Sequence, residues 1–252
     1  MYKNLANTLF LAKAVISMPT CHSSNDTAQQ LAQKADTVEG TVVICESQTA
    51  GKGQRGNTWE AIAGENLTLS VILRPRFLKV RHQFYLNMIA SLAVRDCLEH
   101  FYAHADYKVK WPNDVMCDQK KIAGILIENT INAHQLETAV MGIGLNVNQV
   151  TFKAPKATSL KMKRQTDTAT EVVFERLMHA LEYHYLRLKA SKLAEIKADY
   201  LKFLFGYGEL RKYITEFRFE GKIEDVTDEG RLVVSGPQGM KSYDLKEITF
   251  VY

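Results

Sequence analysis

A segment rich in glycine and cationic residues lies between residues 46 and 59, directly after an apolar run that predicts a buried strand. Its central residues are Gly51, Lys52, Gly53, Gln54, Arg55 and Gly56. Glycine lets a backbone approach a ligand closely, and the interleaved cations suit an anion. The spacing fits neither a Walker A loop nor the Gly-x-Gly-x-x-Gly motif. An anion-binding loop and a solvated surface turn therefore both remain open.

A second polar segment, residues 110–128, reads Lys-Trp-Pro-Asn-Asp-Val-Met-Cys-Asp-Gln-Lys-Lys-Ile-Ala-Gly-Ile-Leu-Ile-Glu. Asn113 and Asp114 could simply form a turn by bonding their own backbone. Lys121 follows a tight turn predicted at residues 118–120, where a lysine is normally an exposed charge. A carboxylate close to a lysine and to phosphates could instead act as a base or as a Mg²⁺ partner.

A third segment starts at residue 142 and reads Gly-Ile-Gly-Leu-Asn-Val-Asn. In this order, the three segments closely resemble those of the biotin protein ligases, and the resemblance extends from about Ser23 to the C-terminus. It implies an enzyme that uses ATP and Mg²⁺ to activate biotin as biotinyl-5′-adenylate. The biotin is then transferred to a lysine of a biotin carboxyl carrier protein or domain, in a biotin-dependent carboxylase.

The resemblance also implies a role for each matching residue. Lys121 would contact the biotin carboxylate and the α-phosphate, and Asp114 would orient the acceptor lysine or a metal-bound water. Arg55 would either hold phosphate or anchor the loop. No residue is assigned as a metal ligand. The expected biotin- and adenylate-binding residues are Ser23, Ser24, Asn25, Gln48, Gly51, Lys52, Gly53, Gln54, Trp59, Asn113, Lys121, Gly124, Gly144 and Asn146.

The glycine-rich segment departs from the commoner family pattern, Gly-Arg-Gly-Arg-Arg-Gly. Lys52 keeps the charge of an arginine but loses its bidentate fork, and Gln54 keeps hydrogen bonding without charge. The roles of these two positions are therefore left open. Trp59 would help to wall the site, although a buried tryptophan is as often a core residue. We expect this loop to be mobile without ligand and to fold over the adenylate.

Three other functions compete with this interpretation. A lipoate or octanoate transferase would share the fold, but the octanoyl-transferring enzymes need a nucleophilic cysteine and usually show a different glycine pattern. A DNA-binding repressor would need an N-terminal winged helix-turn-helix, and only about 20 residues precede Ser23. We therefore expect the short form of the ligase, without a DNA-binding domain. A non-catalytic binding module is the third alternative, and the presence of Lys121, Arg55 and Asp114 disfavours it.

The elements that must position these residues follow from hydrophobic patterning. The first helix would be capped by Ser24 or Asn25 and would extend to about Ala35. The basic run at residues 153–164 predicts a solvated loop, with a contact to the acceptor protein as the alternative. A hairpin is expected through residues 132–134. Strands are expected at residues 14–18, 41–45, 66–73, 107–111, 122–127 and 137–148, and further helices at residues 84–93 and 167–205.

Strands with helices predict an α+β fold built on a mixed β-sheet, of the biotin/lipoate ligase type. At residues 205–208 the composition changes, and short strands separated by glycine-containing turns follow. The resemblance implies that these strands form a small SH3-like β-barrel. We expect a catalytic domain at residues 1–205 and an SH3-like domain at residues 206–252.

The overall composition agrees with an ordinary globular protein. Of the 252 residues, 46% are hydrophobic, and the net charge of +4 is too small to argue for a nucleic-acid partner. The apolar run near the N-terminus is too short to span a bilayer. The four cysteines lack metal-ligand spacing, so we expect reduced thiols in a cytoplasmic protein. Homodimer formation through a sheet edge is left open.

Overall fold

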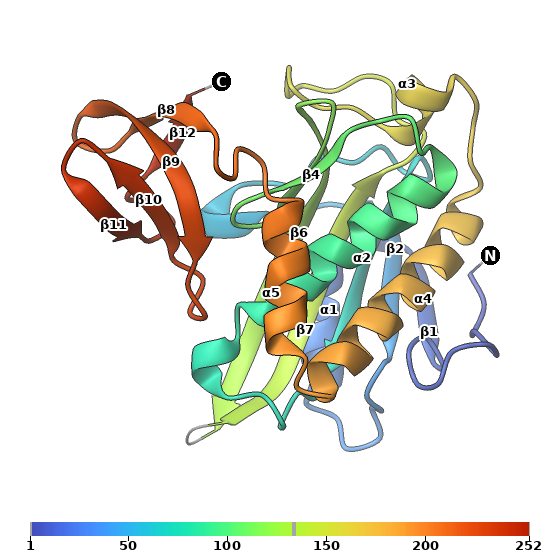
Figure 1. The fold of residues 1–252 in the computed structure, drawn as a ribbon. Helices are drawn as coiled ribbons and strands as arrows, with labels where there is room; N and C mark the ends of the chain where they lie inside the picture. The colour runs from blue at the N-terminus through green and yellow to red at the C-terminus, as the bar shows by residue number, and fades with distance from the viewer. Residues whose placement is uncertain (1, 133–134, 252) are drawn as a thin grey trace.

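The structure, a computed structural model, describes residues 2–132 and 135–251 (Figure 1). Its larger part is a seven-stranded mixed sheet in the order β1-β2-β3-β7-β6-β5-β4. β1 and β2 are parallel, and the other neighbouring strands are antiparallel. The strands are β1 (Val15–Cys21), β2 (Val42–Gln48), β3 (Asn66–Leu73), β4 (Tyr107–Lys110), β5 (Asp114–Cys117), β6 (Lys120–Asn132) and β7 (Gln135–Asn146).

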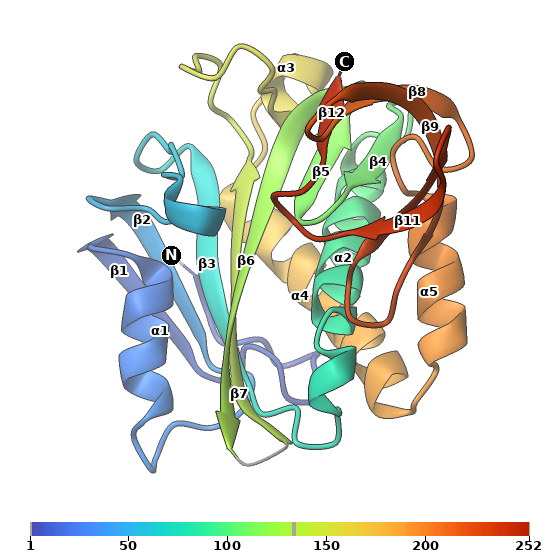
Figure 2. The ribbon, with the colours of Figure 1, turned by 90° about the vertical axis from the view of Figure 1, so that its left-hand side faces the viewer.

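Helices cover both faces of this sheet (Figure 2). On one face, α1 (Ser24–Ala32) packs against β2, β3 and β7. On the other face lie α2 (Tyr85–Phe101), α4 (Thr170–Lys189) and α5 (Leu193–Lys202). Every residue of β3 is buried, as expected for a strand between two helical layers. The short helices are η1 (Gln54–Gly56), η2 (Val80–His82) and α3 (Leu160–Arg164).

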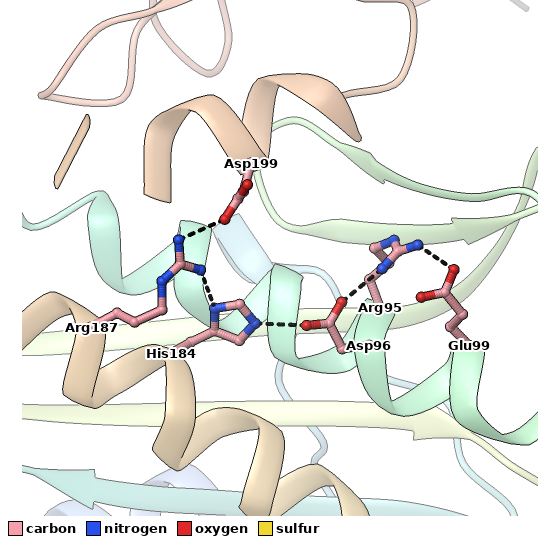
Figure 3. A network of polar contacts seen from close by, with 6 residues as sticks. All are labelled: Arg95, Asp96, Glu99, His184, Arg187 and Asp199. Carbon is pink, nitrogen blue, oxygen red and sulfur yellow. Dashed lines mark hydrogen bonds and ion pairs between the residues drawn. The ribbon is translucent and has the colours of Figure 1, made fainter. Parts of the chain in front are cut away.

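A polar network links the three helices of the second face (Figure 3). His184 Nε2 lies 2.8 Å from a carboxylate oxygen of Asp96, and Arg187 contacts His184 Nδ1 at 3.3 Å and Asp199 at 2.7 Å. Burial acts to raise the pKa of Asp96, but hydrogen bonds from His184 and Arg95 outweigh burial, so this pKa is lowered. Because its members come from α2, α4 and α5, the network holds this helical layer together.

A second sheet, antiparallel and five-stranded, follows α5 in the order β11-β10-β9-β8-β12. Within the described residues no strand pairing joins β11 to β12, so this sheet is open between them. The α+β prediction is confirmed, and the second sheet is consistent with an SH3-like module although it is not a closed barrel. Its strands are β8 (Leu210–Ile214), β9 (Arg218–Val226), β10 (Leu232–Gly236), β11 (Gly239–Tyr243) and β12 (Thr249–Val251).

Some local predictions differ from the structure. The cap of α1 is Ser23 rather than Ser24 or Asn25, and the helix ends at Ala32. Within the described residues the Ser23 side chain makes no cap hydrogen bond, and the Ser23 carbonyl accepts the first bond of the helix from the amide of Thr27 and a second from the Thr27 hydroxyl. The basic run contains α3 and packs beside β6 instead of forming only a solvated loop. The turn of the expected hairpin, residues 133–134, lies outside the described residues.

No helix in the described part of the chain is long and apolar enough to cross a membrane. The four cysteines, Cys21, Cys45, Cys97 and Cys117, are all buried and free, as expected.

Candidate functional site

The three polar segments converge on one pocket, at the end of the sheet where β1, β2 and β7 finish and β6 begins. Gly51, Asp114 and Asn146 do not line it, and the side chain of Arg55 is outside what the structure describes. The expected residues that do line the pocket are Ser23, Ser24, Asn25, Gln48, Lys52, Gly53, Gln54, Trp59, Asn113, Lys121, Gly124 and Gly144.

One wall of the pocket is the N-terminus of α1. Ser24 and Asn25 are almost fully buried, and each is hydrogen-bonded to the hydroxyl of Ser70 on β3. The backbone amide of Ser24 donates to Gln48 Oε1 at 2.7 Å, which fixes the glutamine at the end of β2. Glycine at position 142 leaves the space for this arrangement, because a Cβ atom there would lie 2.2 Å from Asn25 Oδ1.

The glycine-rich segment folds back on itself at the mouth of the pocket. The amide of Trp59 donates to the carbonyl of Gly51 at 2.9 Å, and the amide of Gly53 donates to the carbonyl of Asn57 at 2.7 Å. Lys52 forms an ion pair with Asp26 of α1, and this hydrogen-bonded contact raises the pKa of the lysine. Without ligand, the charge of Lys52 is therefore directed to α1.

Lys121 lies at the start of β6, and its Nζ atom is 2.6 Å from Asp114 Oδ1. In a regular strand, residues 121 and 124 would point to opposite faces of the sheet. However, a bulge shifts the register, so that Asp114 pairs with Gly124 and Met116 pairs with Lys121. The extra residue turns Lys121 to the face that carries Asp114 and Gly124. The bulge thus directs the ammonium group into the pocket.

The basic run supports Lys121 from its other side. The amide of Lys121 donates to the carbonyl of Lys156 at 2.8 Å, and its carbonyl accepts from the amide of Thr158 at 2.9 Å. Asn146 donates to the carbonyl of Thr158 at 3.0 Å, while its Oδ1 is buried without a hydrogen-bond partner in the described part of the chain. Asn146 therefore sits behind Lys121, next to the pocket lining.

Asn113 ends a turn at residues 111–113 and lines the pocket, whereas Asp114 is the first residue of β5, so the predicted turn holds for Asn113 alone. The side-chain amide of Asn113 donates to the carbonyl of Ile125 at 2.7 Å, and the amide of Ile125 donates back to the carbonyl of Asn113 at 2.9 Å. These two bonds fix the turn against β6. Asn113 therefore lies in a turn and lines the pocket, but its side chain bonds β6 and not its own backbone as predicted.

The indole of Trp59 occupies much of the pocket. A Cβ atom at Gly144 would lie 2.2 Å from the ring, and one at Gly124 would lie 3.0 Å from it. Its ring centroid is 5.6 Å from Lys121 Nζ, within the range of a cation–π contact. The remaining cavity is about 50 Å³, smaller than the roughly 300–1,000 Å³ of typical ligand sites. The free space beside the indole is therefore small.

Sequence reasoning missed part of the lining. The apolar residues Leu69, Ile125, Leu126 and Ile143 normally indicate only a core, and Thr68 stands inside a predicted strand where threonine is common, so none of them carries a chemical signal. They reach the pocket because β3, β6 and β7 are neighbours in the sheet. Glycine at position 142, which also lines the pocket, stands inside the third segment and could have been found from its alternation with Gly144.

Comparison with known proteins supports this description. Residues 18–146, about half of the chain, match the model of the biotin/lipoate A/B protein ligase family. The "Bifunctional ligase/repressor BirA" of Bacillus subtilis is 30% identical over 225 residues, which cover 87% of this chain and 68% of that protein. The "Biotin--[acetyl-CoA-carboxylase] ligase" of Mycobacterium tuberculosis is 34% identical over 184 residues, which cover 72% of this chain and 66% of that protein.

Among solved structures, the biotin protein ligase from Aquifex aeolicus in complex with biotin and ATP superimposes with a TM-score of 0.78. The match covers 95% of this chain and 99% of that chain, at 24% sequence identity, and it establishes the fold. Together with the family match, which spans the pocket from α1 to the end of β7, these similarities lead to one assignment. The chain belongs to the biotin/lipoate A/B protein ligase family.

Proposed function

We propose that this protein is a biotin protein ligase, which activates biotin with ATP as biotinyl-5′-adenylate and transfers the biotinyl group to a carrier lysine. The observation that carries the proposal is that the Lys121 side chain lines the same pocket as the polar residues Ser24, Asn25 and Gln48. The cation suits a carboxylate and a phosphate, and the polar wall suits a ureido ring.

In the first step, a carboxylate oxygen of biotin attacks the α-phosphorus of ATP. The bond from that phosphorus to the bridging oxygen breaks, and pyrophosphate leaves. Lys121 offsets the repulsion between the carboxylate and the phosphates, and its flexible stem lets the ammonium follow the moving oxygen. The Nζ atom of Lys121 lies 2.6 Å from Asp114 Oδ1. To contact the ligand, the ammonium group therefore has to leave this ion pair.

In the second step, the amine of a carrier lysine attacks the carbonyl carbon of the adenylate. The bond from this carbon to the AMP oxygen breaks, and the nitrogen loses a proton. Asp114, released from Lys121, is the carboxylate positioned to orient the amine and accept that proton. Arg55 and Lys52, on the loop over the pocket, are expected to hold phosphate once the Lys52–Asp26 ion pair opens.

The site is suited to magnesium that arrives with the nucleotide. Mg²⁺ is usually bound by substrate phosphates together with one or two carboxylates, and Asp114 offers one such carboxylate beside the pocket. In the described part of the chain, no group of three or more His, Cys, Asp or Glu side chains is arranged to hold an ion. The metal would supply charge neutralisation of the phosphates.

The acceptor is expected to be the carrier domain of a biotin-dependent carboxylase, in line with the name of the Mycobacterium tuberculosis relative. The expected compartment is the cytoplasm, where ATP is present and free cysteines stay reduced. A lipoate or octanoate transferase is the alternative within the family. The hydroxyl and amide groups of the pocket wall suit the polar ring of biotin better than an alkyl chain.

The test is transfer to a purified carrier domain with ATP and Mg²⁺, followed by mass spectrometry of the carrier. Biotin, lipoate and octanoate are supplied separately, and pyrophosphate release reports the first step. The proposal expects pyrophosphate release and a biotinylated carrier with biotin alone. Transfer of lipoate or octanoate in preference to biotin would contradict the substrate, and binding of biotin without pyrophosphate release would contradict the enzymatic function.

A further inference from the structure

The side chains of Glu128, Asn25, Ser70 and Ser24 form a continuous hydrogen-bonded row. Asn25 and Ser24 line the pocket, and Glu128 and Ser70 do not. Glu128 Oε2 accepts from Asn25 Nδ2 at 2.8 Å, and Asn25 Oδ1 lies 2.6 Å from the hydroxyl of Ser70. The Ser70 hydroxyl in turn lies 2.8 Å from the hydroxyl of Ser24, which lines the pocket. Ser70 is fully buried, and Ser24 and Asn25 are nearly so. The row thus leads from a carboxylate on β6 to a group that faces the ligand.

The orientation of the Asn25 amide is fixed by its neighbours. Nδ2 faces two groups that only accept hydrogen bonds, the Glu128 carboxylate and, at 3.3 Å, the carbonyl of Leu126. A flipped amide would place Oδ1 against both of these oxygens, which is repulsive. Therefore Oδ1 points to Ser70 and must accept from it.

Proton counting then decides the direction of the remaining bonds. A serine hydroxyl has one hydrogen, and Ser70 uses it on Asn25 Oδ1. Toward Ser24, the oxygen of Ser70 can only accept, so the hydrogen between these two hydroxyls belongs to Ser24. With its hydrogen directed away from the pocket, the hydroxyl of Ser24 can only accept a hydrogen bond from a ligand.

We propose that Glu128 and Ser70, neither of which lines the site as a ligand contact, are positioning residues that set the hydrogen-bond polarity of this pocket. They make Ser24 an obligate acceptor, which selects a ligand with an N–H group at that point. Gln48 complements it, because its Oε1 accepts from the amide of Ser24 and its NH₂ group is left as the donor end. The Ser24 hydroxyl, as an acceptor, matches an N–H group of a ureido ring, and the Gln48 NH₂ group, as a donor, matches its C=O group. The inference rests on the proposed function and specifies how the ring is recognised.

The test compares three ligands by titration calorimetry with the full chain. Biotin and desthiobiotin both contain the ureido group. The third ligand is a cyclic carbonate analogue of biotin, in which oxygen replaces both ring N–H groups. The variants are Ser70→Ala, Glu128→Leu and Glu128→Gln, the last of which keeps an acceptor oxygen for Asn25. Ser91→Ala is the matched control, because Ser91 is equally buried on α2 and its hydroxyl has no hydrogen-bond partner in the described part of the chain.

In Ser70→Ala, the hydroxyl of Ser24 is free to turn and donate to a ring oxygen. We expect biotin to bind about 10-fold more weakly and the preference for biotin over the carbonate to fall by about 10-fold or more. The ratio of biotin to desthiobiotin should not change. Glu128→Leu should shift the preference in the same direction, and Glu128→Gln and Ser91→Ala should leave it as in the wild type. Circular dichroism confirms that each variant is folded, and the two Glu128 variants carry the test if Ser70→Ala does not fold.

An unchanged preference in Ser70→Ala and Glu128→Leu, with biotin still bound, would overturn the inference and leave the proposed function intact. An equal loss of preference in Ser91→Ala would also overturn it, since the effect would then be one of general packing. A wild type that binds neither biotin nor desthiobiotin would overturn the proposed function, and the inference with it.

Discussion

At the scale of single residues, the position of Lys121 depends on one inserted residue in β6. The bulge opposite Val115 and Met116 places Lys121 on the same face as Asp114 and Gly124. Without it, the ammonium would point to the opposite face of the sheet and could not pair with Asp114. The chemistry of the site is therefore set by a backbone irregularity as much as by the type of residue.

A residue-scale prediction concerns the glycine that supports Trp59. In Gly144→Ala, the new methyl group would lie 2.2 Å from the indole and must displace it. We expect biotin transfer to fall by about 10-fold or more, as measured by the initial rate with saturating ATP. Gly124→Ala, whose methyl would lie 3.0 Å from the ring, should have a smaller effect.

The double variant Gly144→Ala with Trp59→Ala separates a clash with the indole from other effects. Because neighbouring residues act non-additively, the double variant should be no slower than Trp59→Ala alone. Full additivity of the two losses would show that Gly144 acts on something other than the indole.

At the scale of elements, the glycine-rich loop is held by contacts that a ligand can replace. The loop carries the Lys52–Asp26 ion pair, which is half exposed, and three backbone hydrogen bonds within residues 51–59. Few buried contacts and exposed backbone bonds are features of segments that open locally. We predict fast amide hydrogen exchange at residues 51–56 in the free protein and slow exchange with biotin and a non-hydrolysable ATP analogue. Equal rates in both states would contradict the prediction that the loop closes over the adenylate.

A second prediction at this scale concerns Glu182, which anchors the N-terminal segment to α4. Its carboxylate accepts hydrogen bonds of 2.8–3.0 Å from the backbone amides of Leu9, Phe10 and Leu11. Burial acts to raise the pKa of Glu182, but these amides outweigh it and lower the pKa. At a pH above the ordinary glutamate pKa, the Glu182 carboxylate therefore contributes fully to the free energy of unfolding. This contribution is lost as the pH falls through the lowered pKa of Glu182 in the folded protein.

Glu182→Gln should lower the free energy of unfolding at pH 7 by about 1–3 kcal/mol. The difference from the wild type should shrink as the pH is lowered below about 4, in urea unfolding followed by circular dichroism. Glu175→Gln, at an exposed position of the same helix, is the control and should have no such effect. A difference that does not depend on pH would contradict a role for the carboxylate charge.

At the scale of the whole molecule, the turn between β9 and β10 docks the second sheet onto the domain that contains the pocket. Asp228 accepts from the hydroxyl of Tyr85 at 2.9 Å, and its other oxygen lies 3.7 Å from His82 Nε2. The carbonyl of Gly230 accepts from Trp111 Nε1 at 2.9 Å. Because Trp111 belongs to the same turn as Asn113, which lines the pocket, this docking contact also supports the pocket.

Asp228→Ala should therefore weaken the docking of the second sheet. We expect a loss of about 1–2 kcal/mol, because the hydroxyl of Tyr85 loses its partner, and a corresponding fall of several degrees in the unfolding temperature. Differential scanning calorimetry measures both quantities. Glu229→Ala, at the exposed neighbouring position, is the control. An unfolding temperature unchanged by Asp228→Ala would show that the turn does not hold the two sheets together.

Much of this organisation was predictable from the sequence, and the limits have physical causes. The helix at residues 84–93 was found from the i, i+4 spacing of Phe84, Met88 and Leu92, and the strand at residues 66–73 was found from its apolar and β-branched composition. The pocket residues were found because they stand in segments that resemble a known family. The bulge that turns Lys121, and the partnership of Ser70 with Asn25, depend on strand pairing between distant segments, which local patterning does not contain.

We propose that Lys121 contacts both the biotin carboxylate and the α-phosphate in the first step. The direct measurement is biotin-dependent pyrophosphate release by Lys121→Ala, beside Lys120→Ala, which removes the exposed lysine of the adjacent turn. We predict a loss of about 100-fold or more in Lys121→Ala, since one electrostatic contact in a transition state contributes about 10²–10³, and a wild-type rate in Lys120→Ala. Pyrophosphate release by a folded Lys121→Ala within a few-fold of the wild type would contradict the account.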